Sequence, residues 1–164
     1  MYLTYGLNFA DLAKMKEANL MILKDTYILT YNRSKGGKLY EIPLSEIPIE
    51  IINYYRSVNI ETGYVFPVLH QDIHITPTQI KTRIKTALKK FNTEIKIVAQ
   101  ELMIPEKVTS YVSRHTFASV LAKEGESLYT ISEMMGHSDL KTTQVYLKEL
   151  DYSGKIAAGR KLLN

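Results

Sequence analysis

Apolar residues recur every three or four positions through most of the chain, while short runs near its front are strand-like instead. The first pattern predicts a helix over Met1–Lys16. The runs Met21–Leu23, Tyr27–Asn32 and Lys38–Ile42 predict three strands. Gly36-Gly37 predicts a two-residue hairpin turn between the last two strands, because glycine accepts the positive φ that such turns need.

The middle of the chain predicts two helices joined by an irregular segment. Glu46–Val58 fits a helix, and Thr76-Pro77 predicts the start of a longer one that ends near Met103. Between them, Thr62–Thr76 is irregular apart from a short extended piece at Tyr64–Phe66. The apolar stripe predicted for the long helix consists of Ile80, Ile84, Leu88, Phe91, Ile95, Val98 and Leu102.

The last third of the chain predicts three helices separated by turns. They are a helix from a Thr109 cap to Gly125, a helix over Leu128–Met135 capped by Ser127 and ended by Gly136, and a helix over Asp139–Lys148 capped by Ser138. A short amphipathic helix is predicted in the tail from Asp151. Together these elements predict a mainly helical fold with a small antiparallel β-sheet of about three strands, the α+β class.

Composition narrows the classes of protein that this chain can belong to. Its 164 residues, 45% of them hydrophobic, suit one domain with a real core. The absence of cysteine excludes disulfides and thiolate metal sites and fits a reducing cytosol, so we expect a cytoplasmic protein. No run of eighteen apolar residues exists, so no membrane span is expected. The net charge of +4 permits a polyanionic partner without demanding one.

Three residues on separate predicted elements suggest phosphodiester chemistry. Arg114 lies three residues before Phe117, beside the buried stripe of its helix, so its guanidinium needs a partner there. That partner is either a carboxylate or a phosphate held by the fork of donors. With His137 in a turn and Tyr146 in the next helix, such residues could together hold a phosphodiester and attack it.

The segments that carry these residues resemble the catalytic domain of the tyrosine recombinases, the phage integrase family. In SRHTFAS and MMGHSDLKTTQVY, Arg114-His115, Gly136-His137 and Tyr146 stand in the order and at the spacing of that family. Nearer the front, YGLNFADLAKM resembles the family's Gly-Leu-Arg…Glu-Leu segment, and RSKGGKLYEIPLS resembles its hairpin that carries a lysine. The resemblance covers nearly the whole chain.

The resemblance implies DNA breaking and rejoining without a metal ion or nucleotide cofactor. Tyr146 is expected to attack a phosphodiester of double-stranded DNA and form a 3′-phosphotyrosyl bond. Arg114 is expected to clamp the scissile phosphate, and His137 to donate a hydrogen bond to it or to help take the tyrosyl proton. Lys35, in the hairpin, is expected to protonate the leaving 5′-oxygen.

Two positions depart from the family's pattern. Asn8 stands where the family has a first arginine, and Tyr111 where it has a histidine. Arg33 is a candidate replacement cation, because it shares a strand face with Lys35 two residues later. Tyr111 can still donate a hydrogen bond to a phosphate oxygen, and Asp11 matches the family's acidic position.

Other polar residues have a structural interpretation beside a functional one. His115 fits a ring packed beside its helix as well as a DNA contact, and Lys38 competes with Lys35 across the turn. Lys81, Lys85 and Lys89, spaced four apart, form either a solvated helix face or a contact with the DNA backbone. His70, Asp72 and His74 alternate as metal ligands on a strand face do, but they lack a fourth ligand, so no metal site is expected.

At the level of the whole protein, residues 1–164 are expected to form a single catalytic domain, a fragment without the family's N-terminal core-binding domain. The resemblance implies a monomer in solution and a homotetramer on DNA. Two rival functions remain open. One is a non-catalytic DNA-binding protein on the same fold, which Asn8 and Tyr111 favour. The other is a type IB topoisomerase, which nicks and reseals one strand.

Overall fold

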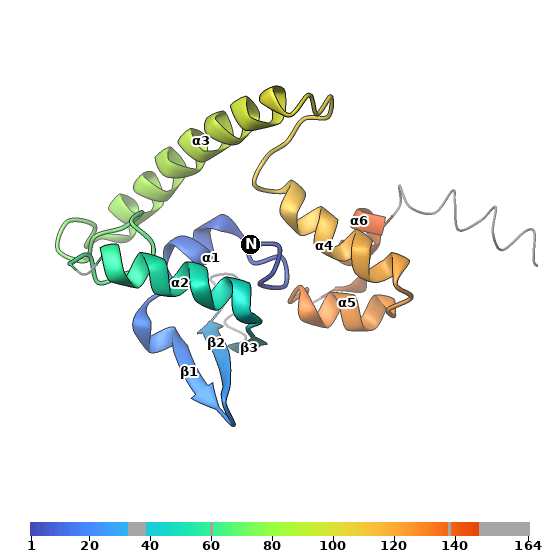
Figure 1. The fold of residues 1–164 in the computed structure, drawn as a ribbon, viewed down its shortest axis with the longest axis horizontal. Helices are drawn as coiled ribbons and strands as arrows, with labels where there is room; N and C mark the ends of the chain where they lie inside the picture. Colours follow the sequence, from blue (N-terminus) through green and yellow to red (C-terminus); the bar gives the residue numbers. More distant parts are fainter. Residues whose placement is uncertain (33–38, 60, 138, 148–164) are drawn as a thin grey trace, which may run out of the picture. The chain divides into compact units, whose positions relative to one another are not determined.

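The computed structural model describes residues 1–32, 39–59, 61–137 and 139–147, except for the side chains of residues 146 and 147. The chain divides into two compact units, Met1–Arg114 and His115–Asn164. The first holds a sheet and three α-helices (blue to yellow in Figure 1), and the second is helical wherever it has regular structure in its described part (orange to red). This is the α+β class that the sequence predicts.

The sheet has three antiparallel strands in the order β1-β2-β3. The strands are β1 (Leu20–Leu23), β2 (Thr26–Asn32) and β3 (Leu39–Pro43). Leu29 of β2 lies opposite Leu20 of β1 on one side and Ile42 of β3 on the other. All three predicted strands are therefore confirmed, whereas the predicted Gly36-Gly37 turn lies outside the described residues.

The predicted helix over Met1–Lys16 is wrong in its extent, because only α1 (Phe9–Ala13) is helical. Tyr5 and Gly6 have φ values of 54° and 67°, a left-handed conformation that no right-handed helix contains. Asn8 then takes an extended conformation and caps α1. The apolar spacing in this segment instead serves a series of turns that bury Leu7 and Phe9.

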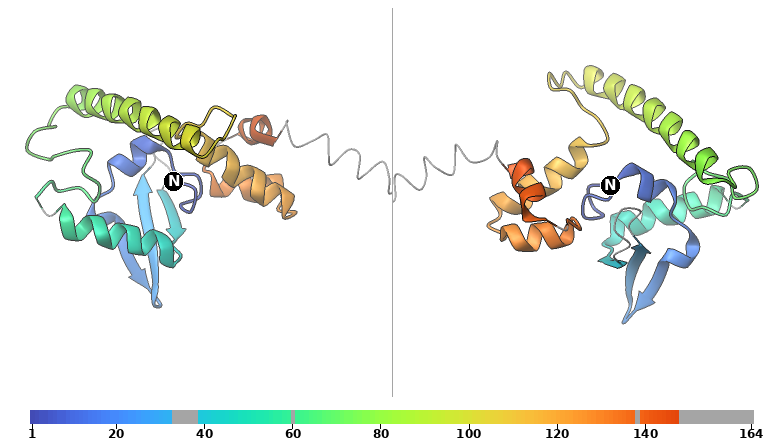
Figure 2. Two further views of the ribbon diagram at one scale, coloured as in Figure 1. Left: turned by 45° about the horizontal axis from the view of Figure 1, so that its top comes forward. Right: turned by 180° about the vertical axis from the view of Figure 1, so that it is seen from behind.

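Helix α2 (Glu46–Val58) has the predicted bounds, and Ile52 on it is buried with Leu29 and Ile42 of the sheet. In Figures 1 and 2, α2 lies across the direction of the strands. The short 3₁₀ helix η1 (Glu17–Asn19) leads into β1. The core cluster formed here consists of Leu7, Met15, Leu29, Ile42, Leu44, Ile52, Val65 and Phe66.

The extended piece predicted at Tyr64–Phe66 is absent, because these residues lie in a chain of bends and turns. The Asn59 side-chain amide donates to the Tyr64 carbonyl at 2.8 Å and to the Val65 carbonyl at 3.3 Å. Carbonyls held by a side chain in this way do not enter a strand ladder.

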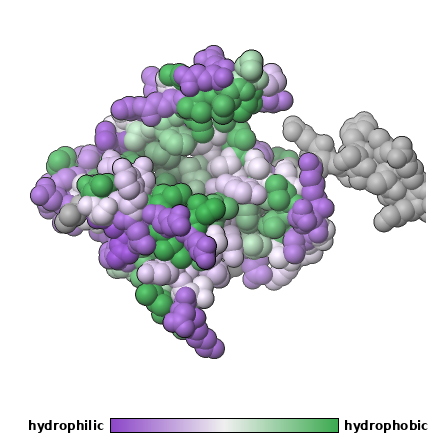
Figure 3. All heavy atoms as spheres, viewed as in Figure 1, coloured by the Kyte–Doolittle hydropathy of each residue, from purple (hydrophilic) through white to green (hydrophobic). Residues whose placement is uncertain are grey.

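Helix α3 (Pro77–Glu101) begins as predicted, with Thr76 and Gln79 capping each other reciprocally and Pro77 at the first position. Its apolar stripe packs in the first half, where Ile84 is buried and Phe91 lies 5.5 Å from Phe9 of α1 between ring centroids. The far end of the stripe is exposed instead: Val98 is 50% exposed, and Leu102, one residue past the helix, is 65% exposed. A helix of 25 residues is far longer than the five-residue α1 on which it packs, so its far end extends beyond that contact. Figure 3 shows apolar side chains in green on this exposed part.

Helices α4 (Val112–Lys123), α5 (Leu128–Met134) and α6 (Leu140–Leu147) follow in the predicted order. The predicted Thr109 cap is wrong, because a turn precedes α4: the Val112 N–H donates to the Thr109 carbonyl at 3.0 Å. Ser127 caps α5 as predicted, accepting from the Thr130 N–H. Asp139 lies before α6 instead of within it and accepts from the Lys141 N–H at 2.9 Å. The predicted Ser138 cap and the tail lie outside the described residues.

The second unit has a small buried core of its own. Among its described residues, the fully or nearly fully buried side chains are Phe117, Ala118, Ile131, Ser132, Met135 and Thr143. They come from all three helices, and α5 packs against α6. Two of the six are polar, so their hydroxyls need hydrogen-bond partners inside the unit.

Candidate active site

Arg114 is held in the first turn of α4 by the backbone of residue 6. Arg114 is 5% exposed, and its Nη1 donates to the Gly6 carbonyl at 2.5 Å. Gly6 has a φ of 67°, and a Cβ placed there would lie 3.2 Å from the Arg114 Cγ. Glycine at position 6 therefore supplies both the backbone conformation and the space that the arginine requires.

The turn before Arg114 is fixed to α3. The Ser110 N–H donates to the Asn92 side-chain carbonyl at 2.8 Å, and the Ser113 hydroxyl donates to the Ser110 carbonyl at 2.7 Å. Tyr111, in the same turn, is 51% exposed. Asn92 is a residue that the sequence analysis missed, and an asparagine within a helix carries no distinctive signal.

Asn8 caps the N-terminus of α1. Its Oδ1 accepts from the Asp11 N–H at 2.8 Å, and its Nδ2 donates to the Asp11 carboxylate at 2.7 Å. Where the family has an arginine, this chain therefore has a helix cap paired with an acidic residue. Asp11 is buried, so the amide also satisfies part of a carboxylate that has little access to water.

A polar pocket of about 250 Å³ lies beside this cap in the first unit. The residues that line it are Leu7, Asp11, Lys14, Met15, Asn19, Leu29, Tyr31 and Asn32. Asn32 is the last residue of β2, directly before Arg33. Arg33, Lys35 and Lys38 themselves lie outside the described residues, so the roles predicted for them stay predictions.

His137 leaves the end of α5 in a fixed backbone conformation. The Gly136 N–H donates to the Glu133 carbonyl and the His137 N–H to the Ser132 carbonyl, both at 2.9 Å. This pair of bonds, with a φ of 69° at Gly136, is a Schellman motif. Gly136 thus allows the helix to stop so that the next residue projects from a defined point.

The His137 ring contacts α6. Its Nδ1 lies 2.8 Å from the Thr143 hydroxyl, and Thr143 is completely buried while His137 is half-buried. Tyr146 follows three residues later in the same helix. The sequence analysis missed Thr143, although a threonine one turn before Tyr146, on the same face of the helix, was the signal available.

The remaining predicted contact residues are distributed over both units. Lys81 and Lys85 are exposed on α3 in the first unit, and His115 is half-buried in α4 at the start of the second. Arg114 belongs to the first unit, whereas His137 and Tyr146 belong to the second. The meeting of these three groups at one phosphate is therefore part of the proposal below.

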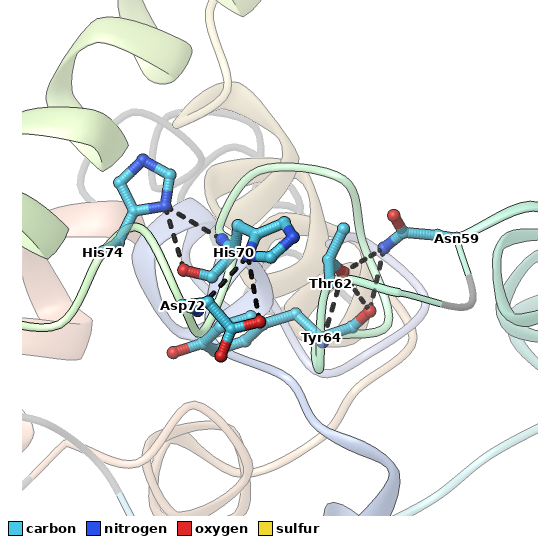
Figure 4. A network of polar contacts seen from close by, with 6 residues as sticks. All are labelled: Asn59, Thr62, Tyr64, His70, Asp72 and His74. Atoms are coloured by element: carbon cyan, nitrogen blue, oxygen red, sulfur yellow. Dashed lines mark hydrogen bonds and ion pairs between the residues drawn. The ribbon is translucent and has the colours of Figure 1, made fainter.

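The alternation of His70, Asp72 and His74 does not form a strand face. These residues lie in a turn, and the Nδ1 of each imidazole accepts a hydrogen bond from its backbone. The His74 Nδ1 accepts from the His70 N–H at 2.9 Å, and the His70 Nδ1 accepts from the Asp72 N–H at 3.2 Å (Figure 4). The strand geometry on which a metal site would depend is absent here. Across the described residues, no group of three or more His, Cys, Asp or Glu side chains is placed to hold a metal ion.

The fold, the buried Arg114 and the Gly-His turn before α6 together define a class of protein. The sequence profile of the phage integrase family matches residues 1–152, and the chain belongs to that family. Within the described residues, no helix is both long and apolar enough to cross a bilayer.

Individual relatives bear the name tyrosine recombinase. One from Thermosipho africanus is 25% identical over 157 residues, which cover 96% of this chain and 50% of that protein. Tyrosine recombinase XerA of Pyrococcus furiosus is 29% identical over 144 residues, 87% of this chain and 46% of that one. The chain thus spans about half the length of these curated relatives.

Two solved structures share the fold. The crystal structure of XerA recombinase superimposes with a TM-score of 0.65 at 20% identity, covering 93% of this chain and 55% of that one. The Tn1549 transposon integrase, solved in complex with transposon right end DNA, gives a TM-score of 0.64 at 17% identity, covering 99% and 56%.

Proposed function

We propose that this protein is the catalytic part of a site-specific DNA recombinase. The observation that carries the proposal is the order and spacing of Arg114-His115, Gly136-His137 and Tyr146 on the helices of the family fold. Double-stranded DNA is the proposed substrate, and a homotetramer assembled on DNA from monomers is the proposed active form. The relatives' greater length supports a further, N-terminal DNA-binding domain in the whole protein.

In the proposed reaction, the Tyr146 oxygen attacks the scissile phosphorus and the bond to the 5′-oxygen breaks. A phenol has a pKa of about 10 and is a poor nucleophile until its developing charge is stabilised. Arg114 supplies a fixed positive charge to the non-bridging oxygens as they gain negative charge. His137 donates to one of them or takes the phenolic proton, and Lys35 protonates the leaving 5′-oxygen. Another 5′-hydroxyl reverses the step.

A second cation is required beside Arg114, and we assign it to Arg33. Asn8 carries no charge, and its amide is already engaged by Asp11 at both of its polar atoms. Asn32, the residue directly before Arg33 in the sequence, lines the polar pocket beside that cap. Tyr111 is half-exposed and adds a neutral donor. The Asn8 cap also favours the second candidate function, a DNA-binding protein on this fold without catalysis.

Covalent trapping tests the proposal. The full chain is incubated with a pool of nicked duplexes of varied sequence in EDTA, so that the short fragment released by cleavage diffuses away and the adduct accumulates. A label at the 5′ end of the cut strand is expected to migrate with the protein in SDS, whereas a 3′ label is not. Tyr146→Phe should remove the adduct, and Arg33→Ala should reduce it severely.

Tyr129→Phe is the matched control, because Tyr129 is 66% exposed on α5 of the same unit. It should trap DNA like the wild type. An adduct that persists in Tyr146→Phe overturns the assignment of the nucleophile. DNA binding with no adduct in the wild type supports the non-catalytic candidate, and supercoil relaxation without exchange between two duplexes supports a type IB topoisomerase.

A further inference from the structure

The hydrogen bond between His137 and Thr143 joins the end of α5 to the middle of α6. It lies entirely within the second unit, with 2.8 Å between Nδ1 and Oγ1. Thr143 has no exposed surface, whereas the His137 side chain is partly open to solvent. The buried hydroxyl therefore contacts the Nδ1 of a histidine that is half-buried as a whole residue.

Both partners of this contact are anchored. The Schellman motif fixes the backbone of His137 through the Ser132 carbonyl, and the Asp139 side chain caps the start of α6. Thr143 is β-branched, and within a helix such a side chain has few rotamers. The position of the hydroxyl is thus set by two packed helices and not by solvent.

A hydroxyl differs from the other common partners of a histidine. It donates to Nδ1 when the ring is neutral with its proton on Nε2, and it accepts from Nδ1–H in the other tautomer or in the imidazolium. A backbone carbonyl can only accept, and a carboxylate favours the imidazolium by its charge. The contact with Thr143 therefore persists whether the ring gains or loses a proton.

We propose that Thr143 is a positioning residue that keeps the His137 ring in one orientation, with Nε2 presented to the scissile phosphate, through changes of its protonation state. This inference deepens the proposed function and rests on it. The reaction runs in both directions at one tyrosine, so a proton leaves in cleavage and returns in rejoining. A partner that tolerates both states preserves the geometry of each step.

Variants at two neighbouring threonines separate this role from simple packing. Thr143→Val keeps the shape and removes the hydroxyl, and it is expected to slow covalent trapping about tenfold to hundredfold, as a small misplacement of a catalytic group does. Thr143→Ser keeps the hydroxyl and should restore most of the rate. Thr142→Val is the matched control, because Thr142 is the next residue and is exposed.

A spectroscopic measurement on the full chain tests the contact without DNA. The protein has four histidines, so ¹⁵N labelling of histidine gives few ring signals, and His137→Gln identifies those of His137. The Nδ1 signal of His137 is expected to move in Thr143→Val, to return towards the wild-type position in Thr143→Ser, and to stay in place in Thr142→Val.

The two readouts keep this inference distinct from the proposed function. An unmoved Nδ1 signal together with wild-type trapping in Thr143→Val overturns the positioning role. A fall in trapping for Thr143→Ser equal to that for Thr143→Val also overturns it, because the hydroxyl is then irrelevant. If the wild type traps no DNA while the Nδ1 signal responds as expected, the proposed function fails and the contact stands.

Discussion

Arg114 is 5% exposed, and its guanidinium donates to a main-chain carbonyl 108 positions earlier in the chain. A buried cation is costly unless donors and acceptors are matched, so this contact limits the cost while holding the side chain in a defined place. Gly6 makes the contact possible by taking a φ of 67°. A residue without a side chain thus contributes to placing the charge on which the proposed chemistry depends.

Gly6→Ala is expected to lower the free energy of unfolding by roughly 1 to 3 kcal/mol, the usual cost of a left-handed non-glycine residue. It should also reduce covalent trapping, because the new Cβ would lie 3.2 Å from the Arg114 Cγ. Urea unfolding and the trapping assay measure the two effects.

Gly125→Ala is the control for this prediction. Gly125 has a φ of 91°, but a Cβ there would meet no atom within 4 Å. The Gly125→Ala variant should be less stable than the wild type, whereas its folded form should trap DNA at the wild-type rate. Equal trapping losses in both variants, at concentrations where both are folded, would show that displacement of Arg114 is not the cause.

At the scale of elements, the sequence predicted most where local chemistry decides the structure. The reciprocal cap at Thr76 and the cap at Ser127 are side-chain contacts over three residues, so the starts of α3 and α5 were correct. The first helix was wrong because Tyr5, a non-glycine residue, adopts a positive φ that no local pattern announces. The turn before α4 depends on Asn92, eighteen residues away from Ser110.

Helix α3 carries the prediction that belongs to this scale. We propose that Lys81 and Lys85, both exposed, contact the DNA backbone. Lys85→Gln is expected to weaken binding to every duplex and to reduce the slope of log affinity against log salt by about one unit. Fluorescence anisotropy over a series of salt concentrations measures both quantities.

Lys90→Gln is the matched change on the same helix. Lys90 lies on a different side of α3 from Lys85, about 140° around the axis at 3.6 residues per turn. Its ammonium already lies 3.7 Å from the Glu94 carboxylate. Lys90→Gln should therefore leave the slope of log affinity against log salt unchanged. If both variants and the wild type have the same salt slope, Lys85 is an ordinary solvated lysine that does not contact the DNA backbone.

At the scale of the whole molecule, the sequence identified the family and the order of the motif but not the contacts that support it. Thr143 and Gly6 act through partners that are distant along the chain or across a turn, and their residue types are common in any protein. The sequence showed at Asn8 only the absence of an arginine's charge. Its role as a helix cap depends on two contacts with Asp11, which only the structure shows.

The oligomeric state belongs to this scale too. The chain is expected to sediment as a monomer of 18.8 kDa in the absence of DNA. With a duplex isolated by the trapping assay, it should form assemblies that contain four protein chains. Analytical ultracentrifugation with separate detection of DNA and protein measures the ratio. A stable tetramer without DNA contradicts the expectation.

The Asn8 cap limits which side chains position 8 can hold. Arginine has no acceptor atom, so an arginine at position 8 could not receive the Asp11 N–H. Asn8→Arg would thus add a charge and at the same time uncap a helix of only five residues. Position 8 can therefore hold either this cap or the charge of an arginine, and not both.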